Sequence, residues 1–154
     1  MNLGEKNNMN KLIIAVVLFL LFGLMACSVE PQKIEIGKDA CSFCKMSIAD
    51  QRFGAEILTK KGKVYLFDDV HCLLEFIKTN TIQQSDIKET YFVGFENPHE
   101  LIEAPKVFLL KSNELHSPMG GNIAVFMDQN KRRDAAAKFN GEEITWEALL
   151  KANQ

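Results

Sequence analysis

The feature that most constrains the fold of this chain is a pattern that occurs twice: two apolar strand-like runs, then an aspartate, then apolar residues at helical spacing. In the first occurrence, runs at 53–59 and 64–67 flank a glycine-containing turn, which predicts a β-hairpin. Asp68 and Asp69 follow as candidate helix caps. The next apolar residues with the spacing of one helix face are Val70, Leu73, Leu74 and Ile77. They predict a helix that ends near Thr79.

The second occurrence begins 59 positions after the first, judged by the phenylalanine that precedes each aspartate. Runs at 106–110 and 123–126 again predict a hairpin, and Asp128 again precedes a predicted helix, here at 131–139. We therefore expect two related ββα halves, with a sequence identity too weak to prove a duplication.

Two further elements complete the expected fold. The run 91–95 predicts another strand, and Thr145 is a candidate cap for a last short helix. Strands and helices in this order predict the α+β class, with the two halves in one compact domain.

The N-terminus reads as an export signal rather than as part of the fold. Lys6 and Lys11 precede the uncharged apolar run 12–25, which is shorter than the roughly 20 residues that a membrane-spanning helix needs. The run ends at Leu24-Met25-Ala26-Cys27, the pattern of a lipobox. We expect residues 1–26 to be removed and Cys27 to be lipidated; the alternative is a short uncleaved membrane anchor. Residues 27–40 would then form a lipidated tether, and residues 41–154 the domain.

Charge and anchoring limit the partners. The 18 basic and 20 acidic residues give a formal net charge of −2, without the basic stripe that nucleic-acid binding requires. Acyl chains on Cys27 would therefore hold the protein to a membrane of the cell envelope, facing the periplasm. Ser28, the residue after the lipidated position, is compatible with onward transfer, so inner and outer membrane both stay open.

The chemistry of the chain is concentrated in Cys41-Ser42-Phe43-Cys44-Lys45-Met46, which brings two thiols and a thioether within six residues. Such soft sulfur donors favour Cu(I) over hard ions, and a thioether is rare among zinc ligands. In an extended segment Cys44 and Met46 would point to the same side. Three alternatives stay open: a plain disulfide, a thioredoxin-like redox pair, and structural zinc, which would need a second ligand pair that the chain lacks.

Other candidate ligands lie further along the chain. Met119 sits in the Pro/Gly-rich segment 117–122, an unusual place for a core methionine, and His116 precedes it, although a lone loop histidine is more often solvated. Cys72 follows His71 in the first predicted turn after the two aspartates, where the helix dipole would lower a thiol pKa. The simpler interpretation of Cys72 is that it packs as a small hydrophobic residue.

At these residues the sequence resembles the NosL family of accessory lipoproteins in nitrous-oxide reductase maturation. The matching motifs are Cys41-x-x-Cys44-x-Met46-Ser-Ile, Arg52-Phe53-Gly54-Ala55-Glu56-Ile57, Gly62-Lys63-x-Tyr65-x-Phe67-Asp68-Asp69, Cys72, Ser117-Pro118-Met119-Gly120-Gly121 and Phe126. Together they cover most of the chain after the export signal. The resemblance also implies two ββα-type units resembling part of organomercurial lyase.

For function, the resemblance implies a Cu(I)-binding metallochaperone without catalytic activity, working beside an ABC transporter to supply nitrous-oxide reductase. The family's copper chemistry carries onto Cys44, Met46, Met119 and Cys41, with His116 and Cys72 as additional candidates. We expect a shallow site of two or three ligands that releases its ion by ligand exchange. The competing hypotheses are a thiol-disulfide oxidoreductase that uses Cys41 and Cys44, and a lipoprotein for general copper handling.

Overall fold

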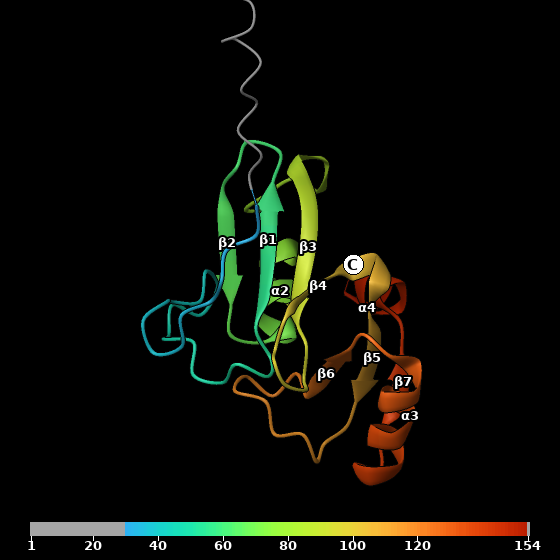
Figure 1. Ribbon diagram of the computed structural model, residues 1–154. Helices are drawn as coiled ribbons and strands as arrows, with labels where there is room; N and C mark the ends of the chain where they lie inside the picture. The colour runs from blue at the N-terminus through green and yellow to red at the C-terminus, as the bar shows by residue number, and fades with distance from the viewer. Residues whose placement is uncertain (1–29, 154) are drawn as a thin grey trace, which may run out of the picture. The chain divides into compact units, whose positions relative to one another are not determined.

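Two small antiparallel sheets with flanking helices make up the fold of the computed structural model, which describes residues 30–153 (Figure 1). Residues 31–154 form one compact unit, and the α+β class predicted from the sequence is confirmed. The predicted export signal and the lipidated Cys27 lie outside the described residues. Among the described helices, none has the length and apolar character needed to cross a membrane.

The first sheet has the strand order β2-β1-β3-β4, with all neighbours antiparallel. Its strands are β1 (Ala55–Thr59), β2 (Val64–Phe67), β3 (Ile87–Val93) and β4 (Leu101–Glu103). Because side chains alternate along a strand, Ala55 and Ile57 of β1 point into the main core, where they pack with Phe67 and Phe92. Helix α2 (Val70–Lys78) covers this face, as Figure 1 shows behind β1 and β3.

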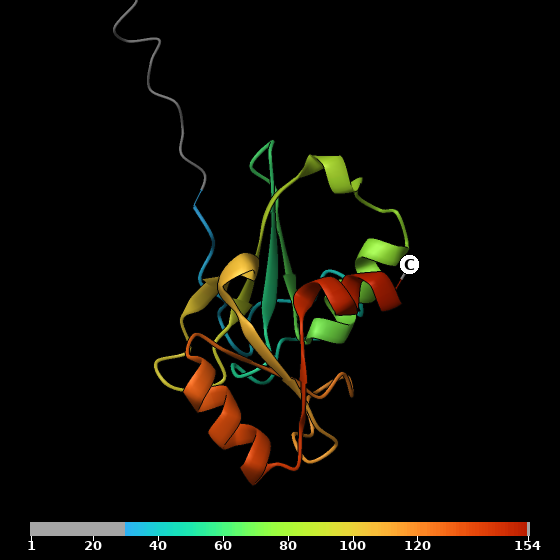
Figure 2. The same cartoon turned by 90° about the vertical axis from the view of Figure 1, so that its right-hand side faces the viewer.

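The second sheet has the order β6-β5-β7, with β5 (Phe108–Lys111) between β6 (Ile123–Phe126) and β7 (Glu142–Ile144). Helix α3 (Gln129–Lys138) lies beside it. Helix α4 (Trp146–Ala152) lies alongside α2 instead, which Figure 2 shows and the hydrogen bond from Asn153 Nδ2 to the Leu74 carbonyl (2.7 Å) confirms. The 3-10 turns Gln84–Asp86 and Ala104–Lys106 complete the described elements.

Each helix begins where a polar side chain satisfies its first free backbone N–H groups. Asp69 accepts a hydrogen bond from the His71 N–H, Asp128 from the Asn130 and Lys131 N–H groups, and Thr145 from the Ala148 N–H. The three caps named from the sequence are therefore confirmed. Strands β4 and β7 were not predicted, because three residues are too few for a recognisable alternation.

The two sheets share one core. Cys41, Phe67 and Phe92 from the first half and Leu109 and Val125 from the second belong to the same buried cluster. A smaller cluster, which contains Phe53, Leu110 and Phe126, lies under β5 and α3. The Phe95 N–H also donates a hydrogen bond to the Val125 carbonyl (2.8 Å), so the backbone joins the halves as well.

Residues 31–40, assigned from the sequence to the tether, lie against the domain. Gln32 donates its N–H to Glu56 Oε2 (2.9 Å), and the Gly37 N–H donates to the Ile48 carbonyl (2.9 Å). Ile34 packs on the main core. The compact unit thus begins at Pro31, within the segment that the sequence assigned to the tether.

Candidate metal centre

The segment Cys41–Met46 forms a closed loop rather than the extended strand expected from the sequence. The Cys41 N–H donates to the Met46 carbonyl (2.8 Å), and the Lys45 N–H donates to the Cys41 carbonyl (3.0 Å). Lys45 has a φ of 66°, a left-handed conformation that reverses the chain, and Ala40 and Ser47 then pair as an antiparallel bridge. The segment is therefore not extended, and the strand alternation that would place Cys44 and Met46 on one side does not apply to it.

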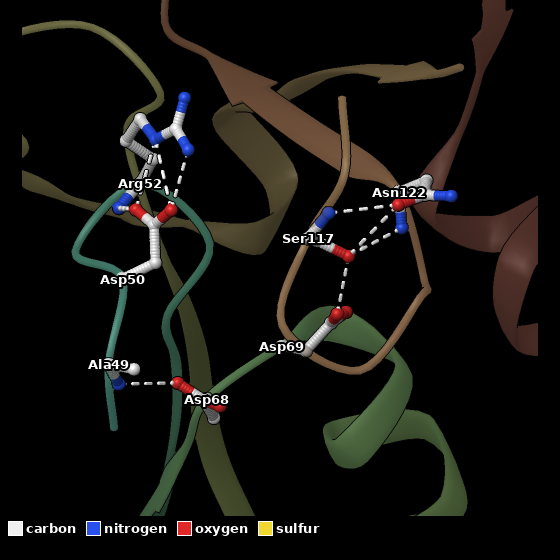
Figure 3. Close-up of polar contacts among 7 residues, drawn as sticks. All are labelled: Ala49, Asp50, Arg52, Asp68, Asp69, Ser117 and Asn122. Carbon is white, nitrogen blue, oxygen red and sulfur yellow. Dashed lines mark hydrogen bonds and ion pairs between the residues drawn. The ribbon is translucent and has the colours of Figure 1, made fainter. Parts of the chain in front are cut away.

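Two sets of hydrogen bonds fix this loop beside the start of α2. The Ser42 N–H donates to the Leu66 carbonyl (2.7 Å), and the Leu66 N–H donates back to Ser42 Oγ (3.2 Å). After the loop, the Ala49 N–H donates to Asp68 Oδ1 (2.9 Å), as Figure 3 shows. The loop is therefore attached to β2 and to the residue just before the helix cap.

This arrangement brings three thiols together. The sulfur atoms of Cys41, Cys44 and Cys72 all lie within 4.8 Å of one another, and all three cysteines are free thiols. Cys41 and Cys72 are buried, with exposed fractions of 1% and 0%, whereas Cys44 is partly exposed. The sequence predicted a shallow site, but of the three thiols only Cys44 is accessible to solvent.

The three thiols differ in the direction in which their pKa values are shifted. The pKa of Cys41 is lowered to about 5, mainly because the Cys72 thiol donates a hydrogen bond to its sulfur; burial opposes this effect, and the backbone N–H of Asp68 adds to it. The pKa of Cys72 is raised, first by the same hydrogen bond and then by burial. Burial is also the main cause of the raised pKa of Cys44. Cys41 is therefore the thiol of the cluster that loses its proton most readily.

The remaining predicted ligands differ in their surroundings. Met46 is 51% exposed and Met119 is half-buried, packed against the core cluster that contains Cys41 and Cys72. His116 is exposed, with a φ of 49°. The sequence favoured simple core packing for Cys72, and the residue is indeed buried. Its sulfur nevertheless lies beside the two other thiols.

Sequence reasoning missed the second role of Asp69. Besides capping α2, its Oδ2 atom accepts hydrogen bonds from Ser117 Oγ (2.5 Å) and from the N–H groups of Met119 (3.0 Å) and Gly121 (3.3 Å). Figure 3 shows Asp69 beneath the segment that carries Ser117 and Asn122. The only signal in the sequence was the pair of aspartates where one cap would suffice.

Fold and site together define a small α+β domain with a sulfur-rich, partly buried metal centre. A NosL family model matches residues 32–152. The chain belongs to the NosL family. A comparison with curated protein sequences finds no match.

Among solved structures, the chain is similar to a crystal structure described as the copper chaperone NosL from Shewanella denitrificans. The two share 20% sequence identity with a TM-score of 0.68, over 80% of this chain and 98% of the other. At this identity the likeness establishes the fold, and the resemblance to part of organomercurial lyase stays a prediction.

The donor set can be tested against possible ions. Three thiols offer only sulfur, whereas Mg²⁺ and Ca²⁺ bind through oxygen and structural zinc takes four ligands in a tetrahedron. Thiolates are preferred ligands of soft ions, Cu(I) among them. The centre therefore fits a monovalent soft ion better than a hard divalent one.

Proposed function

We propose that this chain is a Cu(I)-binding metallochaperone and not an enzyme, with Cys41, Cys44 and Cys72 as the primary copper ligands. The observation that carries the proposal is the meeting of three sulfur atoms within 4.8 Å in a chain of the NosL family. Copper is the cargo of this site, and three thiolates would hold it as Cu(I) selectively. Met119, which packs against the cluster that contains Cys41 and Cys72, is an additional sulfur donor to the bound ion. The exposed Met46 is a donor that can join during loading or release.

The unequal burial of the thiols suggests how copper would leave. Cys41 and Cys72 are buried and hold the ion from the interior, whereas Cys44 is accessible to a partner's sulfur or imidazole. An incoming ligand can replace the accessible thiol first, so the exchange can begin at Cys44 before the buried thiols release. Metal binding also displaces the remaining thiol protons, so affinity rises with pH.

The N-terminal sequence supports a proposal on where in the cell the protein works. We propose that the lipid on Cys27 holds the protein at a membrane of the cell envelope, facing the periplasm, where an ABC transporter and nitrous-oxide reductase are its partners. Support comes from the lipobox pattern and from the family resemblance. Confinement to a membrane surface raises the local concentration of the chaperone near a membrane-bound partner without any new contact. Lipidation would also remove the Cys27 thiol from metal chemistry.

Copper binding is tested with the full chain, purified in detergent under anaerobic reducing conditions and titrated against a chromogenic Cu(I) chelator. We expect one Cu(I) per chain. Cys44→Ser and Cys72→Ser should each weaken binding by more than the roughly 10–100-fold that loss of an outer-shell partner costs. Met46→Ala, compared with Met127→Ala, isolates the role of the thioether, because both methionines are similarly exposed, at 51% and 58%.

Three results would contradict parts of this proposal. Unchanged affinity in both cysteine variants would exclude the three-thiol site. Reversible oxidation of Cys41 and Cys44 at a moderate potential, together with insulin reduction and no protection of Cu(I) from the chelator, would favour the oxidoreductase instead. In cells, a deletion strain that still produces fully copper-loaded nitrous-oxide reductase would leave general copper handling as the better interpretation.

A further inference from the structure

Asp69 is a fully buried carboxylate at the contact between the two halves of the domain. Its Oδ1 atom accepts the His71 N–H (2.8 Å), as a helix cap requires. Its Oδ2 atom accepts three donors from the second half: Ser117 Oγ and the N–H groups of Met119 and Gly121. One carboxylate oxygen therefore serves the helix, and the other serves a segment about 50 residues away.

That segment, residues 117–122, is shaped to receive the carboxylate and is called the Met119 loop below. The loop is closed on itself, because the Asn122 N–H donates to Ser117 Oγ (2.7 Å) and the Ser117 N–H donates to Asn122 Oδ1 (2.9 Å) (Figure 3). Gly121 seats directly against the helix start: a Cβ atom there would collide with the Asp69 carboxylate and lie 2.9 Å from His71 Cβ. The fit leaves no room for a side chain.

The position of Asp69 relates this contact to the thiols. Cys72 follows Asp69 by three residues, and residues three apart in the first helical turn are neighbours on one side of the helix. The adjacent Asp68 accepts the Ala49 N–H from the segment that carries Cys41 and Cys44. The two aspartates thus attach both sulfur-bearing segments to the start of the helix that carries Cys72.

We propose that Asp69 is a positioning residue for the copper site: it holds the Met119 loop against α2 so that the Met119 thioether can reach the ion bound by the three thiols. This inference rests on the proposed function and deepens it. Asp69 acts through the loop and not as a ligand, because its two oxygens already accept four hydrogen bonds and carboxylates are poor ligands for Cu(I).

The deciding variant is Asp69→Asn. Asparagine is as good a helix cap as aspartate, so α2 keeps its first hydrogen bond. Its amide nitrogen, however, is a donor, and it would face the three donors of the Met119 loop. We expect Cu(I) affinity in the full chain to fall by roughly 10–100-fold. Asp128→Asn is the matched control, since Asp128 accepts two N–H groups at the start of α3 as a helix cap of the second half; the Cu(I) affinity of this variant should equal that of the wild type.

A second set of measurements separates positioning from general damage. Met119→Leu should weaken Cu(I) binding, and the double variant Asp69→Asn/Met119→Leu should be no weaker than Met119→Leu alone, because Asp69 acts through Met119.

Hydrogen exchange should show the Met119 and Gly121 amides protected in the wild type and exposed in Asp69→Asn. X-ray absorption at the copper edge should show one sulfur neighbour fewer in Asp69→Asn. If this variant does not fold, Gly121→Ala disturbs the same contact and leaves the carboxylate in place.

The outcomes distinguish this inference from the proposed function. A wild-type chain that binds no Cu(I) overturns both. A wild type that binds Cu(I) while Asp69→Asn binds it equally well overturns the positioning role only, as does a double variant whose losses multiply. Loss of affinity with unchanged amide protection would also overturn it, because the loop would then not have moved.

Discussion

The two ββα halves share their local structure and differ in what they bury. The first half consists of β1, β2, Asp69 and α2, and the second of β5, β6, Asp128 and α3. Helix α2 buries five residues, which are Val70, Cys72, Leu73, Leu74 and Phe76, whereas α3 buries only Arg132 and Ala135. The first helix is therefore held in the core and can present a thiol there, while the second packs on a small sheet with few buried side chains.

The connections inside the two hairpins differ in the same way. Residues 60–63 join β1 and β2 by a short turn, whereas residues 112–122 join β5 and β6 and include the Met119 loop. The second half thus supplies a loop that is bonded to the start of the helix carrying Cys72. One repeated local pattern can serve two purposes when tertiary contacts bury different faces of it.

The largest expected effect comes from the equivalent core phenylalanines. Phe67 is buried against Phe76 (ring centroids 5.2 Å apart) in the cluster that holds Cys41 and Cys72, and Phe126 is buried against Phe95 (5.7 Å) in the smaller cluster. Phe67→Ala and Phe126→Ala should each lower the free energy of unfolding by about 3–5 kcal/mol. Only Phe67→Ala should also weaken Cu(I) binding.

Urea denaturation and chelator competition at low temperature would measure these two effects on each variant. Equal losses of copper affinity in Phe67→Ala and Phe126→Ala would show that the halves contribute alike to the site, and the contrast drawn above would fail.

A somewhat smaller effect concerns the buried carboxyl of the first hairpin. Glu56 on β1 is fully buried with Oε1 unpaired, and burial raises its pKa from 4.5 to about 7. Because the folded state favours the protonated form, the contribution of Glu56 to stability is complete below about pH 4.5 and is lost as the pH rises through 7. Glu56→Gln should remove this decline and raise stability at pH 8 by about 2–3 kcal/mol. In β5 of the second half, the buried residues Leu109 and Leu110 carry no such charge.

The measurement is urea unfolding at pH 5, 7 and 8, with Glu89→Gln on β3 as the control. A wild type and a Glu56→Gln variant whose stabilities change in parallel with pH would show that Glu56 is not the titrating group.

The smallest effect is expected at the cap of α3. Asp128 is exposed and bonds only the first N–H groups of its own helix. Asp128→Ala should therefore cost about 1 kcal/mol and leave Cu(I) binding unchanged. Thermal unfolding would measure the loss, and a marked decrease in copper affinity would show that the second helix is coupled to the site.

Local patterns account for the parts of the fold that were predicted correctly. The caps at Asp69, Asp128 and Thr145 depend on hydrogen bonds to residues two or three positions away, and the hairpin strands depend on neighbouring runs. The conformation of the Cys41–Met46 loop could not be predicted, because it depends on a left-handed Lys45 and on pairing with Leu66, 24 residues from Ser42. No local pattern carries that information.

By itself, the sequence determined the α+β class, the two hairpin and helix units, the sulfur-rich segment and the family to which they belong. Only the tertiary structure decided that Cys72 faces Cys41 and Cys44, and that Asp69 holds the Met119 loop 50 residues away. The physical reason is that sequence patterns report which residues are apolar and how they are spaced. Which buried thiols and carboxylates meet is set by the packing of the two halves on one core.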